Sequence, residues 1–360
     1  MERTVLLMGN INRRAAIKSF FIGGLTPLYA RWDFLKKYED YKYIEAVKNN
    51  IHSKVVSYTD PLCVTAQFKI NEQRARTLFQ KALMEYTGKS TIGEAAKSLF
   101  PKFRTDLRVA IKVNTASTYM PSHQCLAYAI AHSLIGAGLK PENIIIWERT
   151  EKTLMESGYV IRNEPEKIKV IGTDSTGYGY DQEKKEKVHK VPVYVTSILT
   201  KHADYQINLG VLKHHWFTGV ATCLKNHYGS IPLFDNVRLT GIRNLIRLHL
   251  NACDPYISEL NHLMEDKAPT VLNVCDGLLG IYNSGPLGPP QWVQNELLLS
   301  SDPVAIDTLS FYRIEQKRKE VGLPPLLNKA MFLKTSAHSG LGTNNPEQME
   351  IIKKVVGQDG

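Results

Sequence analysis

Residues 204–229, DYQINLGVLKHHWFTGVATCLKNHYG, decide the fold class of this 360-residue chain. The first part of this stretch alternates apolar and polar residues up to Gly210, a pattern typical of a β-strand. Lys213, His214 and His215 follow, so the strand delivers a cation and two imidazoles to the edge of a sheet. Open α/β sheets bind ligands at the carboxyl ends of their strands, which makes this edge the predicted functional site.

The stretch from Thr218 to Tyr228 is compatible with a helix that begins at the same edge and stops at Gly229. Its N-terminal amide groups would face the site, where they could hold an anion. Lys225 and Asn226 then lie about two turns further on. His214 and His215 are neighbours and point in opposite directions in a strand, so at most one of them faces the site.

Strand-like and helix-like segments alternate along the rest of the chain. Several strand-like runs are almost continuously apolar, as buried parallel strands are. Alternation of this kind predicts an α/β fold, with a layered, mostly parallel β-sheet flanked by helices, and leaves open two lobes with a crevice between them. The predicted strands are 107–113, 143–148, 167–172, 204–210 and 270–276. The predicted helices include 71–88, 122–138 with Ser122 as its cap, 150–158, and a short helix opened by a capping box of Thr91 and Glu94. A glycine- and charge-rich segment, 175–192, predicts a hairpin outside the core.

Composition excludes several classes of protein. The chain is 43% hydrophobic and carries a formal charge of +10, but residues 1–37 alone hold seven Lys/Arg against two Asp/Glu. No continuous basic stripe interleaved with aromatic residues is present, which argues against nucleic-acid binding. The sequence has no GxSxG, P-loop or GxGxxG motif, so serine hydrolases, nucleotide kinases and nicotinamide dehydrogenases are disfavoured.

The five cysteines are scattered and form no CxxC pair, which excludes an iron–sulfur motif of the ferredoxin type and a zinc ribbon within this chain. Their apolar surroundings predict buried, inert thiols at Cys63, Cys125, Cys223 and Cys275.

The N-terminus resembles a twin-arginine (Tat) export signal. Arg13, Arg14 and Lys18 precede an apolar run of about a dozen residues, too short to span a bilayer, which needs about 20. The resemblance implies a periplasmic or extracytoplasmic protein, exported in a folded state, and tethered to the membrane if the signal stays uncleaved. An ordinary amphipathic helix is the alternative. The predicted organisation is an export signal at 1–31, a lead-in at 32–50 and one α/β domain at 51–356.

Polar residues end several predicted strands, where α/β proteins place their chemistry. Lys112 and Asn114 follow one strand, Glu148 and Arg149 follow the next, and Asp276 closes another. The glycine- and proline-rich segment after Asp276 suits a shaped loop. Taken together, these strand ends predict one ligand site.

The order of these segments resembles the family called domain of unknown function 362. The runs VAIKVNT, NIIIWERT, DYQINLGVLKHH, FTGVATCLKNHYG, VLNVCDGLLG, SDPVAID and GLGTNNPE carry the resemblance over about residues 50–355. The family signature falls on Lys213, His215, Thr218, Gly219, Thr222, Lys225, Asn226 and Gly229, and its Asp-Pro-Val-Ala-x-Asp motif on Asp302 and Asp307. A further histidine that the family carries has no evident match, because His227 stands early and His249 lies in a partly apolar run.

The stretch from the aspartate-containing strand to Lys225 also resembles lactate-racemase-like proteins, which carry a nickel pincer cofactor on a lysine. That resemblance implies Lys225 as the attachment point and His215 as a metal ligand or an acid/base group.

Each candidate residue has an expected role. The catalytic candidates are Lys213, His215 and Lys225, with His215 also the metal candidate. The ligand-binding candidates are Lys112, Asn114, Glu148, Arg149, Asn208, Thr218, Gly219, Asn226 and Asp276. Asp204, Asp302 and Asp307 are expected to position the site from behind, and Asp302 is also placed to cap the helix that begins at Pro303.

Two classes of function follow. In one, the Lys/His site binds an anionic small molecule or a metal-bound cofactor and performs proton or redox chemistry. In the other, the site only captures a ligand or helps to mature a redox protein partner. The expected partners are a small-molecule ligand, the twin-arginine export machinery and a redox protein, and the sequence leaves open whether the protein is an enzyme.

Overall fold

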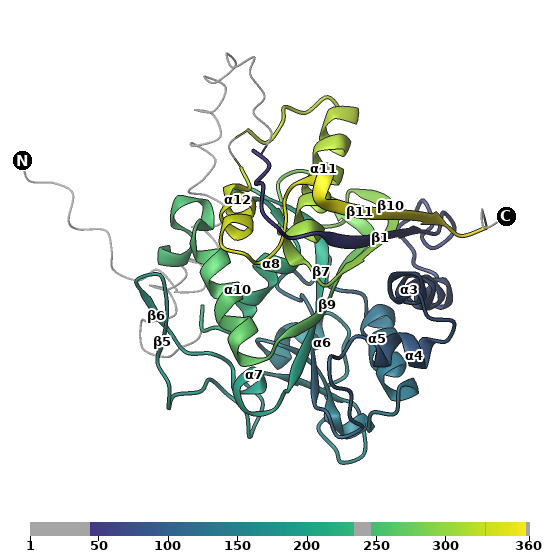
Figure 1. Ribbon diagram of the computed structural model, residues 1–360, viewed down its shortest axis with the longest axis vertical. Coiled ribbons are helices and arrows are strands. Elements are labelled where there is room, and N and C mark those ends of the chain that lie inside the picture. The colour runs from purple at the N-terminus through teal and green to yellow at the C-terminus, as the bar shows by residue number, and fades with distance from the viewer. Residues whose placement is uncertain (1–43, 234–245, 328, 358–360) are drawn as a thin grey trace, which may run out of the picture. The chain divides into compact units, whose positions relative to one another are not determined.

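A nine-stranded mixed sheet, most of whose strand pairs are parallel, forms the centre of the chain in a computed structural model that describes residues 44–233, 246–327 and 329–357 (Figure 1). The strands are β1 (Ser53–Thr59), β2 (Val109–Lys112), β3 (Ile144–Glu148), β4 (Lys169–Gly172), β7 (Tyr205–His215), β8 (Gly219–Ala221), β9 (Thr270–Ile281), β10 (Trp292–Ser300) and β11 (Met349–Val355). Their order is β11-β1-β10-β9-β7-β2-β3-β4, with β8 paired to β7. β10 is antiparallel to both of its neighbours, whereas β9, β7, β2, β3 and β4 run parallel.

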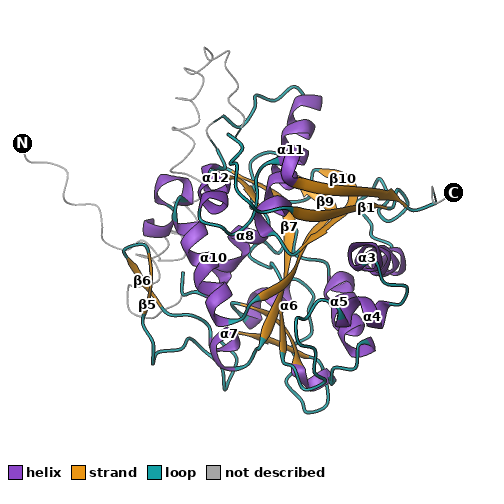
Figure 2. Cartoon of the chain, in the orientation of Figure 1, coloured by secondary structure: helices purple, strands orange, loops and turns teal. Residues whose placement is uncertain are grey.

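Helices cover both faces of the sheet, which confirms the predicted α/β fold (Figure 2). One face packs against α3, α4 and α5, and the other against α7, α10, α11 and α12. The helices are α3 (Glu72–Thr87), α4 (Ile92–Lys97), α5 (Gln124–Gly136), α6 (Glu151–Glu156), α7 (Ser197–Lys201), α8 (Cys223–Asn226), α10 (Tyr256–Lys267), α11 (Pro303–Glu320) and α12 (Met331–His338).

Successive residues of the central strands enter different cores. In β2, Val109 and Ile111 join the core under α3 and α5, whereas Ala110 joins the core on the other face. Ile146 and Trp147 of β3 divide in the same way. A strand with helices on both faces needs apolar residues at every position, which explains the unbroken apolar runs of the sequence.

All five predicted strands are present, although β7 and β9 continue further than expected, to His215 and Ile281. The segment after Asp276 is therefore strand for five more residues rather than loop. The predicted hairpin is also present, as β5 (Glu186–Val188) and β6 (Val191–Val193). From Tyr43 to Gly360 the chain forms one compact unit, so the residues described there form no second lobe.

The predicted helix over Thr218–Tyr228 is wrong in its first half. Gly219 adopts a φ of 77°, and β8 turns back to pair with the end of β7 through Lys213 and Ala221. Only Cys223–Asn226 are α-helical, followed by a 3₁₀ turn at His227–Ser230.

Thr91 caps α4 and Asp302 caps α11 through side-chain oxygens, as the sequence predicted, and Asn71 caps α3 in the same way. The residue before α5 is His123, not the expected Ser122, and Ser122 donates its hydroxyl to the Leu209 carbonyl instead. All five cysteines are buried, which confirms the burial predicted for Cys63, Cys125, Cys223 and Cys275. Within the described ranges, no helix combines the length and apolar character needed to cross a membrane.

Candidate functional site

The carboxyl end of β2 is the point at which the strand order of the sheet reverses. The chain moves outward from β2 to β3 and β4, and then returns to form β7 on the other side of β2. The chain therefore continues toward β3 after β2 and toward β9 after β7, in opposite directions across the sheet. Ligands of open α/β proteins bind at such a switch point. Lys112, Glu148 and Lys213 all lie on these strands, at or near this edge.

A buried ion pair marks the ends of β2 and β3. The Lys112 ammonium group lies 2.7 Å from Oε1 of Glu148 and also donates to the Val113 carbonyl, at 2.6 Å. Burial lowers the pKa of Lys112, and Glu148 opposes that shift. Burial would raise the pKa of Glu148, but Lys112 and the backbone N–H groups of Thr115 and Arg149 hold it below its ordinary value. The pair is therefore satisfied on both sides.

Two glycines allow the backbone to approach this edge closely. An added Cβ at Gly229 would lie 2.5 Å from Oε1 of Glu148 and 2.8 Å from Nζ of Lys112. One at Gly210 would lie 2.7 Å from the carbonyl carbon of Thr222. Real side chains do not approach so closely, so both positions require glycine for α8 and the following turn to pack on the strands.

A chain of four asparagine side chains joins the ion pair to Lys213. The Lys213 ammonium group donates to Oδ1 of Asn114 at 2.9 Å, and Nδ2 of Asn114 donates to Asn226 at 3.1 Å. Asn226 donates in turn to Asn208 at 2.8 Å, and Asn208 to Asn273 at 3.1 Å. The network spans β2, α8, β7 and β9, so four segments far apart in the sequence are fixed relative to one another.

Lys213 is a buried cation at the end of this network. Its side chain is 2% exposed, and burial lowers its pKa to about 7, although Asp276 and Glu148 oppose the shift. A lysine with this pKa has a substantial fraction of neutral amine at neutral pH, which a base or a nucleophile requires.

His123 and Asp276 form a second acid/base pair beside Lys213. Nδ1 of His123 lies 2.7 Å from Oδ2 of Asp276, and the same oxygen accepts from the His123 backbone N–H at 2.8 Å. The neighbouring Ser122 bonds to the backbone of Asn114 in both directions, so one loop carries both His123 and the acceptor of Lys213. Sequence reasoning missed His123 because this residue stood inside the predicted helix 122–138. The available signal was that this helix follows the polar end of the predicted strand 107–113, so its first residues lie at the same edge of the sheet.

His215 and Lys225 belong to a separate buried cluster with His249. The rings of His215 and His249 are stacked with centroids 6.3 Å apart, and Nζ of Lys225 lies 3.1 Å from Nε2 of His249. The Lys225 ammonium group also lies 3.8 Å from the centroid of the Tyr228 ring. Burial lowers the pKa of Lys225 and holds that of His215 well below its ordinary range, so His215 is a neutral imidazole at pH 7. His249 thus joins the histidine and lysine of the signature, although the sequence gave it no clear assignment.

The metal role expected of His215 finds no complete donor set. Its Nδ1 accepts from the backbone N–H groups of Phe217 and Thr218 at 3.2 and 3.4 Å. Within residues 44–233, 246–327 and 329–357, no three His, Cys, Asp or Glu side chains gather closely enough to hold a metal ion. A cofactor attached to Lys225 would have to displace its contacts with Tyr228 and His249. The described residues do not fit the nickel-type group, and no step below uses it.

The three aspartates expected behind the site differ in position. Asp307 accepts from the backbone N–H groups of Cys223 and Leu224 at 2.7 and 3.2 Å, so it holds the first turn of α8, which carries Lys225 and Asn226. The amides that the sequence assigned to a ligand are therefore occupied by Asp307.

The other two aspartates have structural partners. Asp302 caps α11 and also accepts from Ser53 and from the Thr343 backbone N–H. Asp204 was expected near the site, but it pairs with Arg108 at the amino end of β7. At about 3.3 Å of rise per residue, Asp204 lies on the order of 30 Å from Lys213. The expectation that Asp204 positions the site is therefore wrong.

The remaining candidates contribute through backbone geometry. Thr218 donates its hydroxyl to the Val220 carbonyl at 2.8 Å and, with Gly219, shapes the turn between β7 and β8. The backbone N–H of Arg149 donates to Glu148 at 2.8 Å. His214, the neighbour of His215, accepts from the Gly285 backbone N–H at 3.1 Å, so the two histidines serve different surroundings as expected.

Replacing Asp307 with asparagine is expected to change how stability depends on pH. Burial raises the pKa of Asp307 to about 7, so the folded state binds its proton more tightly than the unfolded state between about pH 4 and pH 7. The stability of the wild type should therefore fall as the pH rises through this window, relative to Asp307→Asn. Urea denaturation of both proteins at pH 5 and pH 8 measures this difference, in which the other titrating groups cancel. An equal difference at the two pH values would contradict the pKa assigned to Asp307.

Comparison with known proteins supports the family resemblance. The model of the family described as Domain of unknown function (DUF362) matches residues 109–311, which extend from β2 into α11 and contain the whole asparagine network. No curated protein matches the chain. A crystal structure of a Thermotoga maritima protein from a structural genomics consortium is similar at 15% identity with a TM-score of 0.29. The alignment covers 64% of this chain and 57% of that protein.

Proposed function

This chain belongs to the family described as Domain of unknown function (DUF362), and on that premise we propose that it binds a small organic anion at the carboxyl ends of β2 and β7 and moves a proton through Lys213. The family description names no reaction, so the proposal rests on the residues of this chain. The observation that carries it is the buried Lys213 amine, with a pKa of about 7, held by Asn114 beside the His123–Asp276 pair.

The charge at this edge favours an anionic ligand. Lys112, Lys213 and Arg149 supply cations at the ends of β2, β7 and β3, against the carboxylates of Glu148 and Asp276. Because Lys112 and Glu148 neutralise each other, Lys213 is the cation whose charge responds to a ligand. A ligand carboxylate close to Lys213 would stabilise the protonated amine and raise its pKa.

His123 supplies the second proton position. Asp276 binds Nδ1, so the carboxylate stabilises the tautomer that carries its proton there and leaves Nε2 as the acceptor. His123 and Asn114 are both partly exposed, whereas Lys213 is buried, so the ligand would enter past the loop that joins β2 to α5.

The proton transfer is simple to balance. The neutral Lys213 amine accepts a proton from the carbon next to the ligand carboxylate, and the electron pair of the broken C–H bond moves into the ligand as an enolate. Return of a proton from Lys213 or His123 to that carbon completes the exchange. Transfer to and from positioned groups of this kind accelerates reactions by about 10²–10⁴-fold.

Solvent exchange tests this function without knowledge of the natural substrate. The full-length protein is incubated in D₂O with a panel of 2-hydroxy and 2-amino carboxylates, and loss of the α-proton signal is followed by ¹H NMR. We expect exchange in one class of carboxylate. At carboxylate concentrations well below saturation, the rate should rise through a midpoint near pH 7, as Lys213 of the free protein loses its proton. Binding of a carboxylate without exchange in any class would favour ligand capture over catalysis. The absence of both binding and exchange would refute the site.

We also propose export through the twin-arginine route. This proposal depends on the sequence alone, since residues 1–43 lie outside the described part of the chain. The support is the Arg13-Arg14 pair followed by Lys18 and a short apolar run. Replacing both arginines with lysine in a fusion to a fluorescent protein should keep the fusion in the cytoplasm, whereas the natural sequence should deliver it to the periplasm. Cell fractionation measures the outcome, and equal distribution of the two fusions would contradict export by this route. The export machinery and a redox protein partner also remain predictions.

A further inference from the structure

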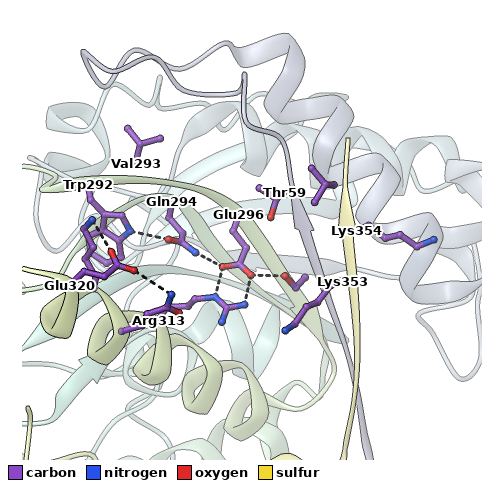
Figure 3. Close-up of a pocket in the computed structure, with 13 residues that line it drawn as sticks. Thr59, Trp292, Val293, Gln294, Glu296, Arg313, Glu320, Lys353 and Lys354 are labelled. Carbon is purple, nitrogen blue, oxygen red and sulfur yellow. Dashed lines mark hydrogen bonds and ion pairs between the residues drawn. The ribbon is translucent and has the colours of Figure 1, made fainter. Parts of the chain in front are cut away.

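A cavity lies toward the β11 edge of the sheet, away from the Lys213 site, where β1, β10 and β11 meet the last turns of α11 (Figure 3). Its volume is about 440 Å³, within the range of 300–1,000 Å³ that is typical of small-molecule sites. None of the candidate residues discussed above lines it. Its walls come from Ser57, Thr59, Trp292, Val293, Gln294, Glu296, Arg313, Gln316, Lys317, Glu320, Lys353, Lys354 and Val355.

Strand β10 supplies one wall of this cavity. The register with β9 shifts between Val293 and Glu296, and Asn295 between them has a φ of 57°. Trp292, Gln294 and Glu296 lie two residues apart and share the face that lines the cavity. Val293 packs against the core on the other face, so its side chain turns away from the cavity.

An oriented guanidinium group forms the floor of the cavity. Nε and NH2 of Arg313 donate to the two carboxylate oxygens of Glu296, each at 2.8 Å, and Glu296 is 3% exposed. Ser57 and Gln294 donate to the same carboxylate at 2.5 and 2.7 Å. Burial would raise the pKa of Glu296, but Arg313 and these donors hold it below its ordinary value. The carboxylate is saturated, and NH1 of Arg313 takes no part in binding it.

The rim adds positive charge. Lys317 and Lys353 join Arg313, so the side chains that face the cavity hold three cations against the two carboxylates of Glu296 and Glu320. Glu320 lies 3.1 Å from Lys317. Lys354, the neighbour of Lys353 in β11, extends to the other face of the strand, where it lies 3.9 Å from Glu85. Lys353 forms no ion pair with any described residue, and in Figure 3 its side chain extends toward the same side as Arg313.

We propose that this cavity is a binding site for a small organic dianion, a phosphate monoester or a dicarboxylate. Lys353 and the free N–H donors of Arg313 bind the anionic groups. The hydroxyl of Thr59 offers a neutral donor, and the edge of Trp292 contacts the apolar part of the ligand. Arg313 and Lys317 each face a carboxylate of the lining, so Lys353 gives the cavity an excess positive charge that an anionic ligand complements.

The indole of Trp292 supplies a direct readout. Its Nε1–H donates to Oε1 of Gln294 at 2.9 Å, beside the Glu296–Arg313 pair. In ¹⁵N-labelled full-length protein this N–H has its own resonance, which the Trp292→Phe variant identifies by its loss. Inorganic phosphate, succinate and neutral succinamide are titrated at low ionic strength. We expect a saturable shift of this resonance with phosphate, with succinate or with both, and the active probe identifies the anionic group.

Matched variants test the assigned contacts. Lys353→Gln should weaken binding of the active probe about tenfold, because it removes a charge-assisted hydrogen bond. Lys319→Gln removes the same charge from an exposed lysine of α11 that does not line the cavity, and should leave affinity almost unchanged. The paired change Arg313→Gln with Glu296→Gln avoids a lone buried charge and should weaken binding further.

Three results would overturn the proposal. The first is the absence of a saturable shift with either anion up to about 10 mM, because binding weaker than this does not indicate a specific site. The second is equal binding of succinamide, and the third is an equal effect of Lys353→Gln and Lys319→Gln. The proton-exchange experiment uses other residues, so this site and the Lys213 site succeed or fail separately.

Discussion

Replacing Lys112 with methionine should lower the free energy of unfolding by about 3–5 kcal/mol, the cost of leaving one member of a buried ion pair without its partner. Lys112 is fully buried and Glu148 is 4% exposed. After the change, Glu148 would keep only the N–H groups of Thr115 and Arg149 as donors. Methionine fills a volume similar to that of lysine, so the loss reports the charge rather than a cavity. Urea denaturation at pH 7 measures it.

Two further variants separate this explanation from a general loss of packing. Adding Glu148→Gln to Lys112→Met removes the unpaired charge and should recover part of the lost stability, which a double-mutant cycle would record as strong coupling. Arg104→Met breaks an ion pair of ordinary length, 2.9 Å to Asp106, between largely exposed side chains, and should leave the free energy of unfolding almost unchanged. If Lys112→Met costs as little as Arg104→Met, the buried pair does not stabilise the fold as described.

Replacing Lys213 with methionine should reduce proton exchange into the active carboxylate by about 10²–10⁴-fold, the contribution of one positioned acid/base group. The same change should stabilise the protein below pH 7. In the wild type, the buried ammonium group is charged in that range and its burial is unfavourable, as its lowered pKa indicates. The wild type regains this stability as the pH rises from about 7 toward the ordinary lysine pKa near 10.4, so the difference between the two proteins should shrink there.

The combination of these two effects distinguishes a catalytic lysine from a structural one. A structural lysine would lose stability and exchange together on substitution. Lys187→Met, at an exposed position of β5, controls for the loss of one charge and should change neither property. Full exchange by Lys213→Met would remove Lys213 from the mechanism and leave His123 as the remaining candidate for the proton transfer.

The fold could be predicted where one segment determines its own environment. The runs at 144–147 and 270–275 are mostly apolar, and only a strand with helices on both faces buries successive residues of such a run. The caps at Thr91 and Asp302 depend on bonds within a few residues and were also predicted. Strands β1 and β10 were not predicted. They form an antiparallel pair whose two segments are separated by more than half of the chain, so no local pattern indicates their pairing.

The sequence predicted many of the residues of the site, but not which of them contact one another. Lys112, Asn114, Glu148 and Lys213 were identified because each ends or follows a strand, and the parallel sheet brings those ends together. His215 and Lys225 were identified with them, yet they lie in a second cluster, since successive residues Lys225 and Asn226 of α8 face different neighbours. His123 and His249 escaped because their importance arises from Asp276 and from the rings of other segments, which no local pattern encodes.

The position of β1 in the sheet determines when this strand can fold during synthesis of the chain. This strand lies between β10 and β11, so the segment of residues 53–59 finds no sheet partner until residues 292–300 and 349–355 have been made. Pairing between segments so far apart in the sequence is slow and leaves apolar edges open during folding. The segment that follows the proposed export signal would therefore be among the last to dock. If that signal uses the twin-arginine route, export of the folded protein would require that synthesis has reached β11.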